Sequence, residues 1–177
     1  MRRLLAGPGT ALVAAASAWN AGGLPLGGLA RAALSAAGAL LLYASVALAS
    51  AIHRSYPARH DSPGDVGELY TEGPYRLCRH PFYMLVMLAQ AAIALTLASP
   101  AGLLAAAALV PAWIALARVE EGELLEYWGD RYREYMRETP LLLPSPGRIL
   151  RGSKRPGHAA NRARRGRRSR AASGHEP

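Results

Sequence analysis

The densest group of chemically capable side chains lies in residues 73–83, which read Gly-Pro-Tyr-Arg-Leu-Cys-Arg-His-Pro-Phe-Tyr. Pro81 suits the first position of a helix, where a missing N–H costs no hydrogen bond, and it pushes His80 toward extended geometry. Arg79 and His80 therefore stand beside a helix N-terminus, whose exposed N–H groups favour anions. The pattern predicts a ligand site. The alternatives are a positive-inside anchor and, for His80 alone, a plain helix cap.

Two consecutive carboxylates, Glu120 and Glu121, stand on the apolar side of a second pattern that predicts an amphipathic helix over 118–138. The remaining charges of this helix form a solvated face. An unpaired carboxylate at a membrane boundary is costly, so we expect a cation beside the pair. That cation is either part of a ligand or an arginine in a structural salt bridge. The candidate arginines for such a salt bridge are Arg76, Arg79 and Arg118.

Other reactive residues predict no further site. His53 and His60, with Asp61 and Asp65 nearby, lack the spacing and the cysteines of a metal-ligand set, and we expect no bound metal. The single Cys78 excludes an internal disulfide and any paired-cysteine redox or metal motif.

Long uncharged runs must position these residues. The sequence has no Asp, Glu, Lys or Arg between Arg3 and Arg31, between Arg31 and Arg54, or over 81–117. A helix needs roughly 20 apolar residues to cross a bilayer, and Pro100 breaks the last run into two. We therefore predict an all-α polytopic membrane protein with about four transmembrane helices followed by the cytoplasmic amphipathic helix. The predicted spans are 4–19, 31–52, 81–98 and 101–117; the first could instead be a cleaved leader.

The distribution of charge predicts orientation and domain limits. Basic residues precede the first span, lie between the second and third, and follow the fourth, which puts both termini in the cytoplasm of a cell-membrane protein. Residues 1–150 carry a net charge of +1 and form the membrane domain, whereas 151–177 hold nine basic groups and one acid. We expect this tail to be disordered and attracted to anionic lipid headgroups. It lacks the interleaved aromatic residues of a specific nucleic-acid binder.

Both patterns resemble one family. The first, Gly73-Pro74-Tyr75-Arg76-x-x-Arg79-His80-Pro81-x-Tyr83, is similar to the signature of the isoprenylcysteine carboxyl methyltransferase and phospholipid methyltransferase group. The second, with Glu120, Glu121, Leu124, Gly129, Tyr132, Tyr135, Thr139 and Pro140, resembles the C-terminal half of that family. The resemblance covers about 67–144.

The resemblance implies a membrane enzyme that uses S-adenosylmethionine to methylate a lipid-like or prenylated acceptor from the bilayer, on a carboxyl oxygen or an amine. It implies a donor site between the loop and the post-hairpin helix, with His80 and Glu121 as candidate bases and Arg118 toward the acceptor. Positions that match the family's donor site, with the adjacent Arg79 and Glu121, are Leu69, Tyr70, Tyr75, Arg79, His80, Pro81, Tyr83, Glu120 and Glu121.

The sequence departs from the family's pattern at two positions. Met84 stands where the family usually has Gly, and Leu116 stands where prenylcysteine enzymes tend to carry Arg, which argues against isoprenylcysteine as the acceptor.

Two other functions stay open at this point. One is an NADPH-dependent membrane reductase of sterol-reductase type, which shares a His-Pro-x-Tyr element. The other is a non-enzymatic membrane anchor for the basic tail.

Overall fold

The computed structural model describes residues 5–55 and 69–144, and every regular element in these two ranges is helical, which confirms the all-α class. The elements are η1 (Leu5–Gly9), α2 (Thr10–Trp19), α3 (Gly28–Ser55), the 3-10 turn η3 (Gly73–Arg76), α4 (Pro81–Thr96), α5 (Pro100–Trp128) and α6 (Asp130–Glu138). The predicted basic tail 151–177 and the loop residues His60, Asp61 and Asp65 lie outside the described residues.

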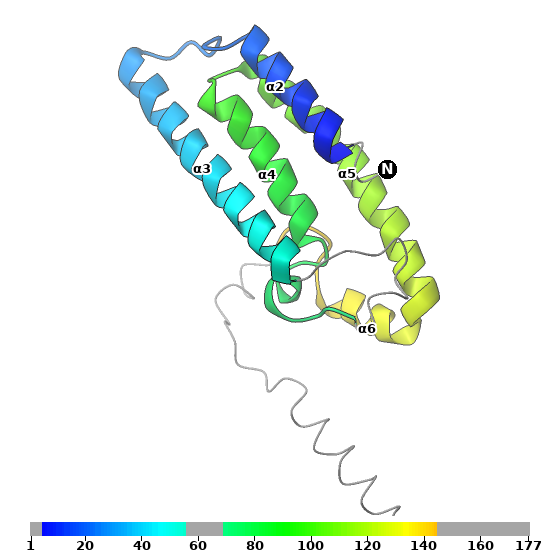
Figure 1. The fold of residues 1–177 in the computed structure, drawn as a ribbon. Helices are drawn as coiled ribbons and strands as arrows, with labels where there is room; N and C mark the ends of the chain where they lie inside the picture. Colours follow the sequence, from blue (N-terminus) through cyan, green and yellow to red (C-terminus); the bar gives the residue numbers. More distant parts are fainter. Residues whose placement is uncertain (1–4, 56–68, 145–177) are drawn as a thin grey trace, which may run out of the picture. The chain divides into compact units, whose positions relative to one another are not determined.

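The four longer helices lie side by side (Figure 1). Helix α3 packs on α4, α4 packs on α5, and α2 packs against both α4 and α5. The C-terminal end of α3, the start of α4, the end of α5 and all of α6 lie at the same end of the bundle (Figure 1). The topology therefore brings the 69–80 loop to the segment that carries the two glutamates.

The turn between α4 and α5 forms where Pro100 predicts a break. Pro100 occupies the first turn of α5, and the Ser99 hydroxyl accepts a hydrogen bond from the Gly102 N–H at 3.2 Å. A Ser cap followed by Pro satisfies or removes the N–H groups that a helix start leaves without partners. This turn reverses the chain and makes α4 and α5 antiparallel neighbours.

Small and polar residues fill the interfaces of the bundle. Gln90 is buried in α4; its side-chain oxygen accepts from Trp113 Nε1 at 3.1 Å, and its Nε2 donates to Thr10 Oγ1 at 3.2 Å. Ser17 of α2 is fully buried against Gly102 of α5. Close approach at small residues and interhelical hydrogen bonds are the usual means by which helices associate in membranes. These contacts hold η1 and α2 against α4 and α5.

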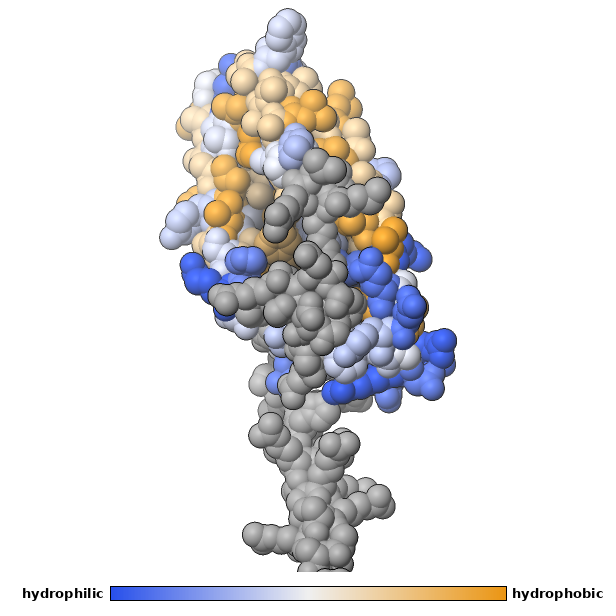
Figure 2. Space-filling model, turned by 45° about the vertical axis from the view of Figure 1, so that its right-hand side comes forward, coloured by the Kyte–Doolittle hydropathy of each residue, from blue (hydrophilic) through white to orange (hydrophobic). Residues whose placement is uncertain are grey.

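Large apolar side chains face outward instead. Helices α3 and α5 are long and apolar enough to cross a membrane, yet only 11% and 28% of their most apolar windows are buried. A core helix of a soluble protein would be mostly buried, so this exposed apolar surface is the kind that a membrane or another apolar partner covers. In Figure 2 the apolar surface covers the helical bundle, and hydrophilic residues gather at the end where α6 lies.

One prediction about the helices differs from the structure, and another is not settled by it. A separate helix starting at 118 is wrong, because α5 continues to Trp128 and the break comes at Gly129, whose φ of 53° favours glycine. Charged residues after 117 end the apolar run but not the helix, since Arg, Glu and Leu are good helix formers. The four-span topology stays a prediction, because α4 has 16 residues and α2 has 10, fewer than a crossing usually needs.

The close packing of α2 on α5 predicts a specific instability. A Cβ added at Gly102 would collide with Ser17 Oγ and lie 2.9 Å from the Ala94 Cβ. Overpacking of this kind costs roughly 1–3 kcal/mol, so Gly102→Ala should lower the melting temperature of the detergent-purified protein.

Gly122 on the same helix provides the control. A Cβ there meets no described atom within 4 Å, so Gly122→Ala should raise stability by about 1 kcal/mol through better helix propensity. Melting curves followed by circular dichroism compare the two variants. A Gly102→Ala protein as stable as the wild type would contradict the packing of α2 described above.

Candidate active site

The 73–83 motif folds into a tight connection that is tied to the chain after α6. Gly73 has a φ of 60° and begins the turn η3. The Arg79 N–H then donates to Pro140 O at 2.8 Å and the His80 N–H to Leu141 O at 3.1 Å, just before Pro81 begins α4. These two backbone bonds fix the direction in which the Arg79 and His80 side chains leave the chain.

The Arg79 guanidinium joins three segments. Its Nε donates to Glu121 Oε1 at 2.5 Å, and its Nη1 donates to the carbonyls of Met136 and Thr139 at 2.9 and 2.5 Å. The Arg79 side chain is 11% exposed and that of Glu121 is 4% exposed. Of the two partners predicted for Glu121, the structure has the arginine. The predicted contact of Arg79 and Glu121 with a cofactor stays a prediction.

His80 lies between the two glutamates. Its Nδ1 is 3.7 Å from Glu120 Oε2 and its Nε2 is 3.7 Å from Glu121 Oε1, distances too long for hydrogen bonds. The ring stacks on Tyr83 with centroids 5.4 Å apart and planes within 1°. The side chain makes no cap hydrogen bond to α4, so the helix-cap alternative is wrong. Its surroundings favour positive charge, in contrast to the anion expected at this helix end.

The His80 Nε2 atom is buried and has no hydrogen-bond partner among the residues that the structure describes. Most buried polar side-chain atoms in proteins have a partner, so each exception calls for an explanation such as a bound ligand or water. The orphaned nitrogen, two carboxylates and an aromatic wall together suit a cationic organic molecule. No group of three His, Cys, Asp or Glu side chains within 5–55 and 69–144 is arranged to hold a metal ion.

A side chain of α4 makes a hydrogen bond to Glu120. Tyr83 Oη donates to Glu120 Oε2 at 2.6 Å, and the Tyr83 ring contacts Trp113 with centroids 5.3 Å apart. Tyr83, Trp113 and Leu116 belong to the buried core between α4 and α5. The polar site therefore lies directly on the apolar core, which fixes the Tyr83 hydroxyl.

The other predicted site residues lie around this centre at different depths. Tyr70 and Tyr75 have ring centroids 6.1 Å apart, and the Tyr75 carbonyl accepts a 2.6 Å hydrogen bond from Tyr135 Oη. Leu69 is half-buried beside Tyr70, whereas Arg118, predicted to face the acceptor, is exposed. Pro81 is buried at the start of α4.

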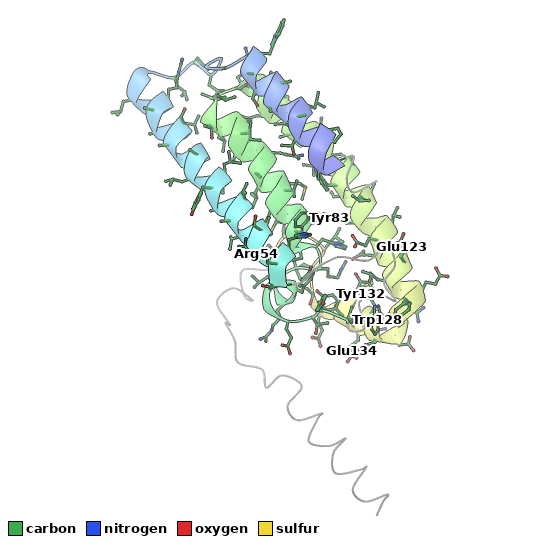
Figure 3. All side chains as sticks on the ribbon, viewed as in Figure 1. Arg54, Tyr83, Glu123, Trp128, Tyr132 and Glu134 are labelled. Atoms are coloured by element: carbon green, nitrogen blue, oxygen red, sulfur yellow. The ribbon has the colours of Figure 1, made fainter. Side chains whose placement is uncertain are left out.

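Two tyrosines of α6 have no predicted role in the site. Burial raises the pKa of Tyr132 and of Tyr135, so both hydroxyls are protonated at neutral pH. Tyr135 has the Tyr75 carbonyl as its partner, but the buried Tyr132 hydroxyl has none among the described residues. Tyr83, Tyr132 and Trp128 all lie at the α6 end of the bundle (Figure 3). The spacing of Glu120, Trp128 and Tyr132 in multiples of four residues was the available sequence signal for Tyr132.

An apolar cavity of about 310 Å³ opens between α3 and the 74–78 loop. Its volume is within the range of small-molecule pockets. Its lining residues are Leu48, Ala51, Ile52, Ser55, Pro74, Leu77, Cys78, Pro81, Met84 and Leu85. Burial raises the pKa of the Cys78 thiol to about 11, despite an opposing backbone hydrogen bond at His80, so the thiol is protonated and unreactive near neutral pH.

The family model described as phospholipid methyltransferase matches residues 33–131, more than half of the chain. The chain belongs to the phospholipid methyltransferase family. No curated protein matches the sequence. The matched range contains the 73–83 motif and both glutamates, which confirms the resemblance drawn from them.

The phospholipid methyltransferase family gives the chain its general class, a membrane methyltransferase. The reductase and the membrane anchor gain no support from this membership. The match ends at Arg131, so it reaches neither Tyr132 nor the 140–141 segment that pairs with the loop. The part of the site built by α6 therefore lies outside the family match and is described from the geometry of this methyltransferase.

The Arg79–Glu121 pair predicts a large loss of stability when one partner is removed. Arg79→Met leaves a buried carboxylate without its cation, which costs about 3–5 kcal/mol. The double variant Arg79→Met with Glu121→Gln should recover part of that loss, because the uncompensated charge is gone. Arg133→Ala removes an exposed pair with Asp130 and should cost at most about 1 kcal/mol.

Chemical denaturation in detergent measures these differences for the wild type, Arg79→Met, Glu121→Gln, the double variant and Arg133→Ala. If the double variant loses the sum of the two single losses, Arg79 and Glu121 are not coupled and the ion pair described above is contradicted.

Proposed function

We propose that this methyltransferase transfers the methyl group of S-adenosylmethionine to the amine of a membrane lipid. The observation that carries the proposal is His80, with a buried unpartnered nitrogen between Glu120 and Glu121. A site with two carboxylates around a neutral or protonatable ring suits molecules with ammonium or sulfonium groups. S-adenosylmethionine carries an ammonium and a sulfonium group, and a protonated lipid amine carries an ammonium group.

The donor is held, in this proposal, by the loop and the end of α5. Glu120 accepts from its ammonium group, and the faces of Tyr75 and Tyr83 contact the adenine ring or the sulfonium. Leu69, Tyr70, Pro81 and His80 complete the walls. When bound, the donor supplies an electrophilic methyl group on positively charged sulfur. The family's usual dependence on this donor and the cation-favouring geometry support the assignment.

The acceptor's apolar chain occupies the cavity between α3 and the 74–78 loop, according to the same proposal. The cavity is lined almost wholly by apolar side chains, and Leu48 on its wall is 55% exposed on the apolar surface of α3. Met84 lines this cavity, so its departure from the family's glycine changes the space for the acceptor. Leu116 is 7% exposed within the core and, unlike an arginine, offers no charge to a prenylcysteine carboxylate.

An amine acceptor needs a base, because a protonated amine has no lone pair for attack. His80 is the candidate, since its Nε2 has no partner among the described side chains and an added proton would face the Glu121 carboxylate at 3.7 Å. Glu121 itself is already paired with Arg79 and is a poorer base for that reason. The remaining work of the chain is to align the two reactants and exclude water.

The placement of basic residues supports a cell-membrane protein with both termini in the cytoplasm. The site then faces the cytoplasm, from which a water-soluble donor arrives, while the acceptor comes from the bilayer.

The test is isothermal titration of the detergent-purified full chain with S-adenosylmethionine and, separately, NADPH. We expect binding of the first and none of the second. Methyl transfer to vesicles with and without an aminophospholipid then identifies the acceptor. Binding of NADPH alone would overturn the assignment of S-adenosylmethionine as donor. Methyl transfer only to a prenylcysteine would overturn the assignment of an amine as acceptor.

Glu120 should contribute to donor affinity through its charge. Glu120→Gln removes the charge but keeps the shape, and losing a charge-assisted hydrogen bond costs roughly 1.5–3 kcal/mol. The donor's dissociation constant should therefore rise by more than tenfold while the melting temperature changes little. Glu123, exposed on the same helix, provides the control, since Glu123→Gln should leave affinity unchanged. Equal losses in the two variants would contradict the placement of the donor beside Glu120.

The acceptor cavity predicts a separable effect. Ala51 lines the cavity, so Ala51→Trp should fill it, raise the KM for the lipid acceptor several-fold and leave donor affinity unchanged. Ala39 is exposed on the same helix and does not line the cavity, so Ala39→Trp is the control. Unaltered lipid kinetics for Ala51→Trp would show that the acceptor chain binds elsewhere.

A further inference from the structure

Two buried polar atoms of this site have no hydrogen-bond partner within the described part of the chain: His80 Nε2 and the Tyr132 hydroxyl. The first belongs to the motif at the start of α4, and the second comes from α6, beyond the residues matched by the family. A buried hydroxyl without a partner costs about 1–3 kcal/mol, so folding alone gives no reason for Tyr132 to carry one.

The local fold buries Tyr132. Gly129, with its positive φ, ends α5 and lets α6 start in a new direction, and the Tyr132 N–H donates to the Gly129 carbonyl at 3.1 Å. The Tyr132 side chain is then buried, with the residue 1% exposed. Arg79 contacts the same helix through the Met136 carbonyl, one turn further on. The negative charges of Glu121 and Glu120 and the positive charge of Arg79 all act on the Tyr132 hydroxyl.

We propose that the Tyr132 hydroxyl hydrogen-bonds the amino-acid end of bound S-adenosylmethionine. This inference rests on the proposed function. The amino-acid end is the part of the donor that carries both an ammonium and a carboxylate. It matches a buried, unpartnered hydroxyl on which the carboxylates of Glu121 and Glu120 and the guanidinium of Arg79 act. The adenine end has no such pair of charges.

The protonation state of the Tyr132 hydroxyl fits this role. Burial, and then the nearby carboxylate of Glu121, raise the pKa of Tyr132, so the group keeps its proton at neutral pH and can donate to a carboxylate. The Arg79 Nε and Nη1 atoms donate to protein acceptors, whereas the Tyr132 hydroxyl has no partner among the described residues and can donate to a ligand.

Tyr132→Phe tests the proposal, because it removes the one oxygen and keeps the ring. Two probes separate the ends of the donor. S-Adenosylhomocysteine has the amino-acid end, and 5′-methylthioadenosine lacks it. Titration calorimetry on the full chain measures the affinity for each probe. Tyr132→Phe should weaken the binding of S-adenosylhomocysteine about tenfold or more, equivalent to about 1.4 kcal/mol, and leave the affinity for methylthioadenosine unchanged.

Tyr135→Phe is the matched control, three residues along the same helix. It removes a hydroxyl that donates to the Tyr75 carbonyl, so it should lower the melting temperature of the free protein. Tyr132→Phe should leave that temperature equal or higher, because its hydroxyl has no protein partner in the described structure to lose.

The outcomes separate this inference from the function on which it rests. A wild type that binds neither S-adenosylmethionine nor S-adenosylhomocysteine would overturn the proposed function itself. Unchanged affinity in Tyr132→Phe, with a wild type that binds, would show that the hydroxyl meets only a buried water. Equal weakening of both probes would overturn the contact with the amino-acid end.

Discussion

The ion pair between Arg79 and Glu121 is the interaction on which the site depends. A buried ion pair adds little net stability, because the desolvation of two charges offsets their attraction. It does fix geometry, since neither charge tolerates another position. One guanidinium here determines where the loop before α4, the end of α5 and the carbonyls at the end of α6 meet. The backbone bonds from 79 and 80 to 140 and 141 complete the same junction.

The two glutamates at this junction have different partners. Arg79 neutralises Glu121, while Glu120 accepts from the neutral hydroxyl of Tyr83. His80 lies between the two carboxylates and against the Tyr83 ring, with its Nε2 buried. These groups lie beside an apolar core, which weakens screening and strengthens the attraction between opposite charges.

The sequence predicted the helices where physical signals are strong and local. Uncharged runs located α3, α4 and most of α5, and Pro100 located the turn between the last two. The end of α5 was missed because leaving an apolar run does not end a helix; a glycine with positive φ does. The pairing of Glu121 with Arg79, 42 positions apart, depends on how α4 and α5 pack, as does the burial of Tyr132. No periodicity in one segment contains that information.

The distance along α5 from its first residue to the two glutamates can be compared with the thickness of a bilayer. A helix rises 1.5 Å per residue, so Glu120 lies about 30 Å along the axis from Pro100, which is about the thickness of the hydrocarbon layer. A helix that enters the hydrocarbon at Pro100 therefore leaves it at the two glutamates. A helix placed in this way would hold the carboxylates at the level of the lipid headgroups, where the proposed donor from water and the head of a lipid acceptor could meet without either crossing the apolar layer.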